Sequence, residues 1–98
     1  MADIEFSNAA IADLEEIDGY SVAVFGEEVG ESYMRGFDRA FARLSQYPFI
    51  GPATPEYGKT YRCLIHGSHR IFYIVQAELV LIVRIIHHAR DAGRELQG

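Results

Sequence analysis

The chain has 98 residues, of which 49% are hydrophobic and 23% charged, and its formal net charge at pH 7 is -5. The length predicts one domain over residues 1–98, and the composition predicts a packed core, which excludes a disordered chain. The acidic balance excludes a general polyanion-binding surface, because non-specific affinity for nucleic acid needs a dense cover of Lys and Arg. Residues 1–50 hold ten acidic and three basic side chains, whereas residues 51–98 hold four and six. This leaves room for a local basic patch in the second half alone.

Sequence features that report on the cellular compartment are few. The one cysteine, Cys63, excludes an internal disulfide and is typical of a reducing compartment. The first ten residues contain neither a basic segment nor a long apolar one, so we expect no signal peptide. The longest apolar run, 79–86, is too short to span a bilayer. We therefore expect a cytoplasmic protein that does not insert into a membrane.

The first half of the chain predicts a short strand followed by two helices. Residues 3–6 alternate polar and apolar side chains, as a half-buried strand does. Ser7 is a good N-cap residue, and the apolar spacing after it predicts a helix over 9–25. Gly26 ends this helix, and a second helix is predicted over 27–46. Because the connection is so short, the two helices are expected to form an antiparallel hairpin.

The second half predicts a loop and three strands. Residues 48–60 contain all three prolines and read as an ordered loop without regular elements. Beyond it the apolar period changes to two, which predicts strands over 61–66, 69–75 and 79–87. The Gly67-Ser68 dipeptide suits a tight hairpin turn with glycine first.

This order of elements predicts an α+β domain. The N-terminal strand joins a mostly antiparallel four-stranded sheet, and the helical hairpin packs on one face of that sheet. The last strand is apolar on both faces apart from Arg84, which predicts a central or well-covered position. We expect the opposite sheet face to be curved, partly exposed and the working surface.

Four arginines are the candidate functional cations of the second half: Arg62, Arg70, Arg84 and Arg90. In a tight hairpin Arg62 lies opposite Tyr73 and Arg70 points to the other face. With Arg90 and Arg94 after the last strand, such a group could bind a phosphate or a carboxylate by bidentate contacts. We expect the sheet's open face, with Arg62, Arg70, Arg84 and Arg90, to matter for function. The alternative is that each lies at the rim of the sheet and pairs with a helix carboxylate. Spacing alone favours this alternative.

The histidines give no metal or catalytic pattern. In a tight hairpin His66 and His69 are cross-strand neighbours, and His87 and His88 end the last strand. No third ligand has convincing spacing, and no nearby carboxylate orients a ring, so we expect no metal, no cofactor and a place at the surface or at an interface. Cys63 lies in a predicted strand and is expected to be a small core residue rather than a nucleophile.

Seven segments, taken in order, resemble the RelE/ParE superfamily of bacterial type II toxins over residues 4–96. They are 11–17, Phe25-Gly26, Tyr47-Pro48 with Gly51, Tyr61-Arg62, 67–73, 82–87 and Arg90-Asp91. No one of them is specific by itself, whereas the ordered set is. The fold of this superfamily agrees with the helical hairpin and antiparallel sheet derived above.

The resemblance implies one of two activities. RelE-like members are ribosome-dependent mRNA endonucleases, and Arg62, Arg70 and Arg90 fall at positions that are basic in them. However, Leu64 stands in place of a strand lysine, and Leu96 stands about where the best-known branch has a tyrosine. The strand and C-terminal sequences at 72–73 and 84–87 resemble instead the ParE branch, which is similar to inhibitors of DNA gyrase.

The sequence therefore predicts a ParE-like toxin of the plasmid-stabilisation type. The resemblance implies that it inhibits DNA gyrase by protein binding, catalyses nothing itself, and is neutralised by an antitoxin whose disordered C-terminal segment folds on it. We expect no sequence-specific nucleic-acid binding. The residues expected to bind the target or the antitoxin are Arg62, Arg70, Arg84, His87 and Arg90. An mRNA endonuclease, and a non-toxic binding module, remain the alternatives.

Overall fold

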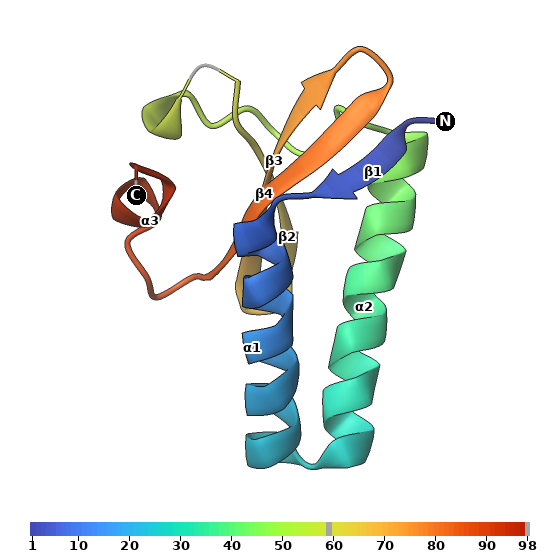
Figure 1. Ribbon diagram of the computed structural model, residues 1–98, viewed down its shortest axis with the longest axis vertical. Coiled ribbons are helices and arrows are strands. Elements are labelled where there is room, and N and C mark those ends of the chain that lie inside the picture. The colour runs from blue at the N-terminus through green and yellow to red at the C-terminus, as the bar shows by residue number, and fades with distance from the viewer. Residues whose placement is uncertain (59, 98) are drawn as a thin grey trace.

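The computed structural model describes residues 1–58 and 60–97 and contains a four-stranded sheet and two long helices (Figure 1). The elements in chain order are β1 (Asp3–Phe6), α1 (Asn8–Phe25), α2 (Glu27–Gln46), the short 3₁₀ helix η1 (Pro55–Tyr57), β2 (Arg62–His66), β3 (His69–Gln76), β4 (Leu79–His87) and α3 (Ala92–Gln97). The predicted strands and long helices are all present, with ends that differ from the predicted ones by no more than one residue.

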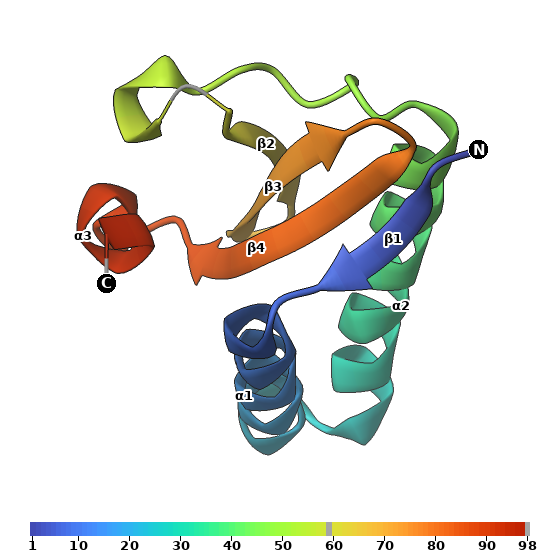
Figure 2. The same ribbon diagram turned by 45° about the horizontal axis from the view of Figure 1, so that its top comes forward.

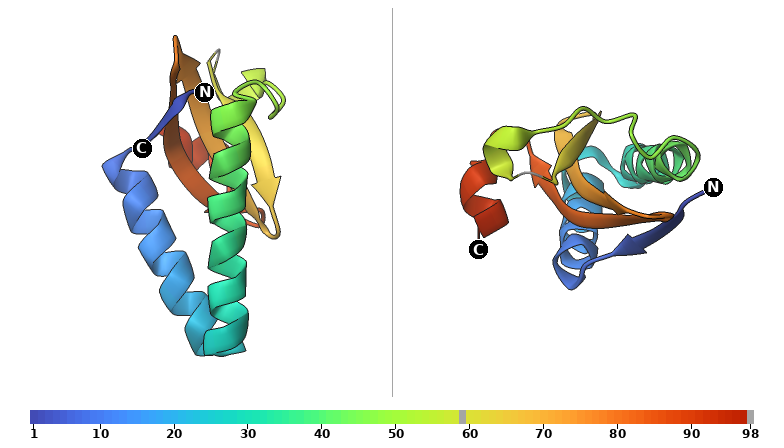
Figure 3. Two further views of the ribbon diagram at one scale, coloured as in Figure 1. Left: turned by 90° about the vertical axis from the view of Figure 1, so that its right-hand side faces the viewer. Right: turned by 90° about the horizontal axis from the view of Figure 1, so that it is seen from above.

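The sheet has the strand order β1-β4-β3-β2, so β4 and β3 are its central strands. β1 runs parallel to β4, whereas the other two strand pairs are antiparallel. A mostly antiparallel sheet and a central last strand are therefore confirmed. The two long helices form the expected antiparallel hairpin, which lies against one sheet face and extends beyond the strands at its tip (Figures 2 and 3).

Local sequence explains where the helices begin and turn. The Ser7 side chain accepts a hydrogen bond of 3.0 Å from the Ala10 amide, which caps the start of α1. Gly26 joins the helices with a φ of 89°, a value that favours glycine. One turn later, a Cβ atom at Gly30 would lie 2.9 Å from Cγ2 of Val22, so glycine allows the helices to approach closely.

The main core lies between the helical hairpin and the sheet. Its largest fully buried side chains on this side are Phe37, Leu44, Ile71, Tyr73, Val80 and Ile82. The hydroxyl of Tyr73 accepts a hydrogen bond of 2.9 Å from the Gly51 amide. A Cβ atom at Gly51 would lie 2.6 Å from the Cys63 carbonyl oxygen, so the loop after α2 can pack here only through a glycine.

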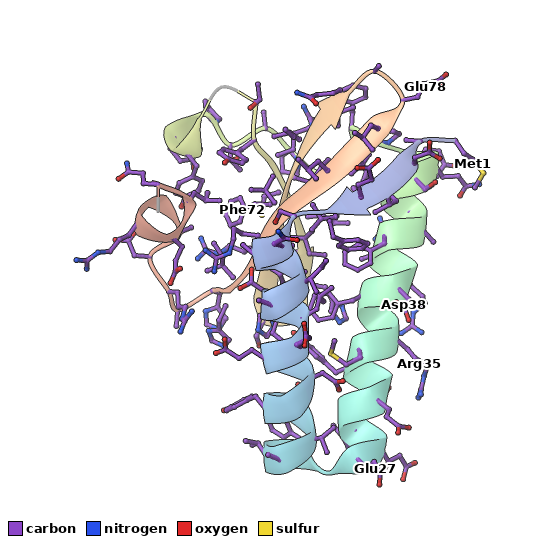
Figure 4. All side chains as sticks on the ribbon, viewed as in Figure 1. Met1, Glu27, Arg35, Asp38, Phe72 and Glu78 are labelled. Atoms are coloured by element: carbon purple, nitrogen blue, oxygen red, sulfur yellow. The ribbon has the colours of Figure 1, made fainter. Side chains whose placement is uncertain are left out.

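The opposite face of the sheet is partly covered. A second small cluster joins Cys63, Phe72, Ile86 and Ala92 and is flanked by Tyr57 and Leu96. Figure 4 places Phe72 on the side of the sheet that faces α3. The C-terminal helix and η1 thus occupy part of the face that was expected to be the working surface.

The loop prediction for residues 48–60 is wrong at one place, because Pro55–Tyr57 forms a turn of 3₁₀ helix. Ala53 also forms an isolated bridge to Arg62. Proline at the first helical position sets φ for this turn, a local signal within the proline-rich segment. Position 59 of the predicted loop lies outside the described residues. Within residues 1–58 and 60–97, no helix combines the length and the apolar character needed to cross a bilayer.

The β3–β4 turn carries backbone strain. β3 extends to Gln76 and β4 begins at Leu79, so Ala77 and Glu78 alone make the turn. Ala77 has a φ of 53°, in the left-handed region, where a Cβ atom is unfavourable. Glycine is the usual residue in this backbone conformation.

We predict that Ala77→Gly stabilises the protein. Removing the Cβ atom relieves the strain at positive φ and is expected to raise the free energy of unfolding by about 0.5 to 1 kcal/mol. For a domain of this size the midpoint of thermal unfolding rises by roughly 2 to 6 °C, measurable by circular dichroism. The control is Ala12→Gly at an exposed position of α1, which is expected to lower the free energy of unfolding by about 1 kcal/mol. If Ala77→Gly is no more stable than the parent, the backbone at Ala77 is not strained.

Candidate functional site

Helix α1 closes an exposed strand edge. β1 pairs with β4 as far as Phe6 and Ile82, so the outer edge of β4 is free beyond that point. Ser7 donates its hydroxyl to the Val83 carbonyl at 2.6 Å, and the Ile85 amide donates to Oδ2 of Asp13 at 2.8 Å. Side chains at and after the start of α1 therefore replace the missing neighbouring strand, which protects the edge from pairing with another chain.

Arg84 is held by carboxylates on both sides. Its Nε and Nη2 donate to the two oxygens of Asp13 at 2.8 and 3.0 Å, a bidentate ion pair. Its Nη1 lies 3.3 Å from a carboxylate oxygen of Glu95 in α3. The hydrogen bond with Asp13 raises the pKa of Arg84, against the opposing effect of burial. The structural alternative, pairing with a helix carboxylate, is the arrangement observed for this arginine.

Arg62 is used to hold the loop after α2. Its Nε donates to the Gly51 carbonyl at 2.7 Å, and its Nη2 donates to the Phe49 carbonyl at 3.0 Å. The guanidinium carbon lies 5.3 Å from the centre of the Phe49 ring. Arg62 pairs with Tyr73, whose ring is in the main core, so it lies on the hairpin side of the sheet. The expectation that Arg62 shares the open face with the other arginines is wrong.

Arg70 keeps an unneutralised charge on the opposite face. Its Nη2 donates to the carbonyls of Arg90 at 2.8 Å and His87 at 3.4 Å, and its guanidinium lies 5.5 Å from the Phe72 ring. Its Nε is buried without a hydrogen-bond partner. In the part of the chain that the structure describes, no carboxylate lies within ion-pairing distance of it. Arg90 is nearby, 56% exposed, with a long 3.4 Å contact to Glu95.

His66 and His69 pack more closely against the rest of the fold than the sequence suggested. His66 and His69 are direct cross-strand partners, as predicted. However, both pack against α2, where Tyr33 contacts His69 Nδ1 through its hydroxyl at 2.6 Å and His66 Nε2 through its carbonyl at 2.9 Å. A Cβ atom at Gly36 would collide with the His66 ring, 2.1 Å from Cε1. A surface position is therefore wrong for these two residues. Sequence reasoning did not identify the Tyr33 hydroxyl as a partner of these rings.

A small cavity of about 190 Å³ lies between α1 and the ends of β3 and β4. Its lining includes Glu16, Ile17 and Tyr20 from α1, together with His69 and Arg90. Asp13, Ile85 and His87 complete it. The cavity thus brings two predicted site residues, His87 and Arg90, together with α1, an element that the sequence analysis did not connect with them.

Burial shifts the pKa values of His69, which lines the cavity, and of Cys63, which lies in the second cluster. Burial, reinforced by the neighbouring His87, His66 and His88, lowers the pKa of His69 to about 4, while Asp13 opposes this shift. Burial raises the pKa of the Cys63 thiol, with Arg70 opposing. Cys63 is buried in the second cluster, as expected of a core residue. Among residues 1–58 and 60–97, no group of three or more His, Cys, Asp or Glu side chains is placed to hold a metal ion.

Comparison with solved structures shows which fold this is. A chain of the chromosomal ParDE toxin–antitoxin system from P. aeruginosa superposes with a TM-score of 0.75 at 21% identity, covering 89% of this chain and 96% of that one. A chain of the RelBE2 toxin–antitoxin complex from Mycobacterium tuberculosis gives a TM-score of 0.64 at 20% identity, covering 88% and 96%. The protein therefore has the fold of the RelE- and ParE-type toxins.

Sequence comparison defines the branch. The family model described as the ParE toxin of the type II toxin–antitoxin system parDE matches residues 4–92. The toxin ParE1 of Mycobacterium tuberculosis is 38% identical over 91 residues, which is 92% of this chain and 93% of that protein. The toxin ParE1 of Caulobacter vibrioides is 30% identical over 96 residues, 98% and 99% of the two chains. The chain belongs to the ParE family of toxins of type II toxin–antitoxin modules, as the resemblance in the sequence indicated.

We predict that His69→Gln weakens the dependence of stability on pH. In the folded protein His69 protonates only near pH 4, whereas in the unfolded chain its pKa is about 6.5, so the unfolded state binds more protons between these values. The free energy of unfolding that this residue contributes is present above about pH 6.5 and is lost as the pH falls towards 4.

Urea unfolding at about pH 7 and at about pH 4.5 measures the effect. From the higher pH to the lower, the free energy of unfolding is expected to fall further for the parent than for His69→Gln. His88→Gln, at the exposed residue after β4, is the control; His88 has the weakest effect of the three histidines that lower the pKa of His69, so this variant is expected to differ only slightly from the parent. Equal losses in the parent and in His69→Gln would show that His69 is not kept neutral by its surroundings.

Proposed function

We propose that this toxin inhibits DNA gyrase by binding to it and that a cognate antitoxin neutralises it. The observation that carries the proposal is the match to ParE toxins over nearly the whole chain, at 38% identity to ParE1 of Mycobacterium tuberculosis. Because gyrase acts on the bacterial chromosome, the proposal places the protein in the cytoplasm. As part of a plasmid-stabilisation module, it acts on cells that have lost the antitoxin.

The state of the arginines favours protein binding over RNA cleavage. An endonuclease of the RelE class needs several free cations around the scissile phosphate to stabilise its developing charge. Arg84 is neutralised by Asp13 and Glu95, and Arg62 is committed to two backbone carbonyls. Arg62 and Arg70 have no ion pair among the described residues, but each donates to two backbone carbonyls, and Arg90 keeps an exposed guanidinium with one long contact to Glu95. This is a small basic surface on a chain whose net charge is -5.

The helical hairpin offers the apolar surface that an antitoxin segment needs. Ile11, Val24, Phe25 and Val29 are 45% to 60% exposed. Acidic side chains surround the tip, among them Glu27, which Figure 4 labels there. An antitoxin segment that folds on this surface is expected to be amphipathic, with basic side chains beside its apolar face. The solved structures with this fold include the toxin–antitoxin complex RelBE2 of Mycobacterium tuberculosis and the DinJ–YafQ complex of E. coli.

Purified protein distinguishes the two activities directly. With gyrase and plasmid DNA, we expect loss of supercoiling and accumulation of cleaved DNA complexes, and relief of both by the antitoxin encoded beside the toxin. With translating ribosomes, we expect intact mRNA. Cleavage of mRNA on ribosomes, with gyrase unaffected, would refute the proposal in favour of the RelE-class alternative. No effect in either assay would refute it in favour of a non-toxic binding module.

The variant that tests the candidate surface is Arg70→Ala. It is expected to raise the concentration needed for half-inhibition of gyrase about tenfold, the loss of about 1.4 kcal/mol of binding free energy. The midpoint of thermal unfolding of this variant is measured as well, because the substitution also removes the hydrogen bonds from Arg70 to backbone carbonyls. The control is Arg35→Ala, since Arg35 is exposed on α2 and points away from the sheet in Figure 4. Loss of folded protein in proportion to loss of inhibition would assign Arg70 a structural role.

A further inference from the structure

The cavity beside α1 adjoins the segment that holds Arg70, because His87 and Arg90, whose carbonyls accept from Arg70, both line it. It lies where α1 runs along the free part of β4, and its volume is about 190 Å³. Pockets for whole cofactors or drug-sized ligands are larger, about 300 to 1,000 Å³. A cavity of about 150 Å³ is already enough for a benzene ring. This one therefore has room for a single side chain or for a fragment of the same size.

His87 leaves an N–H donor free at the cavity. The Ala89 amide donates to His87 Nδ1 at 3.1 Å, so the ring proton of neutral His87 is on Nε2. His87 Nε2 has no hydrogen-bond partner within residues 1–58 and 60–97. His69 is held at its Nδ1, which lies 2.6 Å from the Tyr33 hydroxyl; this hydroxyl also lies 3.2 Å from the His66 carbonyl and accepts from the Ser68 amide at 3.1 Å.

The two carboxylates at the cavity, those of Asp13 and Glu16, differ in whether they can accept further hydrogen bonds. Asp13 is neutralised by Arg84 and also accepts from the Ile85 amide. Glu16 is exposed at the rim and has no ion pair among the described residues. Arg90 adds a cation on the other side. The free groups are thus the His87 Nε2–H, the Arg90 guanidinium and one carboxylate, with hydrocarbon walls from Ile17, Tyr20 and Ile85 between them.

We infer that this cavity binds the carboxamide of an Asn or Gln side chain from a protein partner. The amide oxygen accepts from the His87 Nε2–H, and the amide nitrogen donates to the Glu16 carboxylate. A carboxylate ligand is repelled by Glu16 and an ammonium ligand by Arg90, whereas a neutral carboxamide avoids both repulsions. The inference rests on the proposed function in one respect, namely that the protein acts by binding other proteins.

The surface beside the cavity indicates a polypeptide rather than a free small molecule. Tyr20 lines the cavity and is 62% exposed. Val24 is one helical turn further along α1, and Phe25 contacts the Tyr20 ring edge-to-face at 6.5 Å; these two residues are 53% and 60% exposed. The apolar strip made by these three side chains leads from the cavity to the hairpin tip. A segment of a partner that covers the strip brings its next polar side chain to the cavity.

The test uses the full chain and three fragments of equal size: benzamide, benzoate and benzylamine. Each is titrated into ¹⁵N-labelled protein and followed by NMR. Benzamide is expected to shift the Ile85 amide and the ring resonances of His69 and His87, with a dissociation constant on the order of 1 mM, as suits so small a ligand. Benzoate and benzylamine are expected to bind at least fivefold more weakly.

Matched variants locate the contacts. Glu16→Ala and His87→Leu are each expected to weaken benzamide binding about fivefold or more, because each removes one hydrogen-bonding group and leaves the walls in place. Glu15→Ala and His88→Leu, the exposed neighbours that do not line the cavity, are expected to leave it unchanged. The inference is overturned if benzamide does not bind, if benzoate or benzylamine binds as well, or if the neighbouring variants have the same effect. None of these readouts depends on gyrase, so this inference and the proposed function can fail separately.

Discussion

One carboxylate, that of Asp13, joins the parts of this protein that the backbone alone does not connect. β1 is four residues long and leaves the outer edge of β4 without a neighbouring strand beyond Ile82. Asp13 accepts three hydrogen bonds there, two from Arg84 and one from the Ile85 amide, and Arg84 continues to Glu95 in α3. Both partners of the ion pair are less than a fifth exposed, so its loss would leave a partly buried charge without compensation. The position of α1, the protected strand edge and the C-terminal helix all depend on this network.

The same network decides which charges remain for a partner. Arg84 would be the central member of a basic surface if the sheet face were open, but it is enclosed between two helices. Arg62 fastens the loop after α2. What remains is Arg70 with Arg90, and Arg90 also lines the small cavity beside α1 together with His69 and His87. These are features of a protein that recognises others through a few groups, in keeping with the family to which it belongs.

Much of the fold could be predicted from sequence, because apolar periodicity and turn residues act locally. The strand at 3–6, the helix at 27–46 and the strand at 79–87 have the predicted bounds, and the Gly67 turn sets the β2–β3 register. Periodicity assigns a residue to a face but not to a partner. Asp13 and Arg84 are 71 positions apart, so their pairing depends on how far β1 extends, which no local pattern reports. The Tyr33–His69 contact and the left-handed Ala77 were missed for the same reason, since both are imposed by tertiary packing.

A double-mutant cycle tests the role of this ion pair most directly. The free energy of unfolding is measured by urea denaturation for the parent, Asp13→Ala, Arg84→Met and the double variant, and the same cycle on Arg90 and Glu95 is the exposed reference. The coupling energy of Asp13 with Arg84 is expected to be on the order of 2 kcal/mol, against about 0.5 kcal/mol or less for the reference pair. Equal, small coupling energies in the two cycles would mean that α1 is placed by apolar packing alone and that Arg84 is available to a partner.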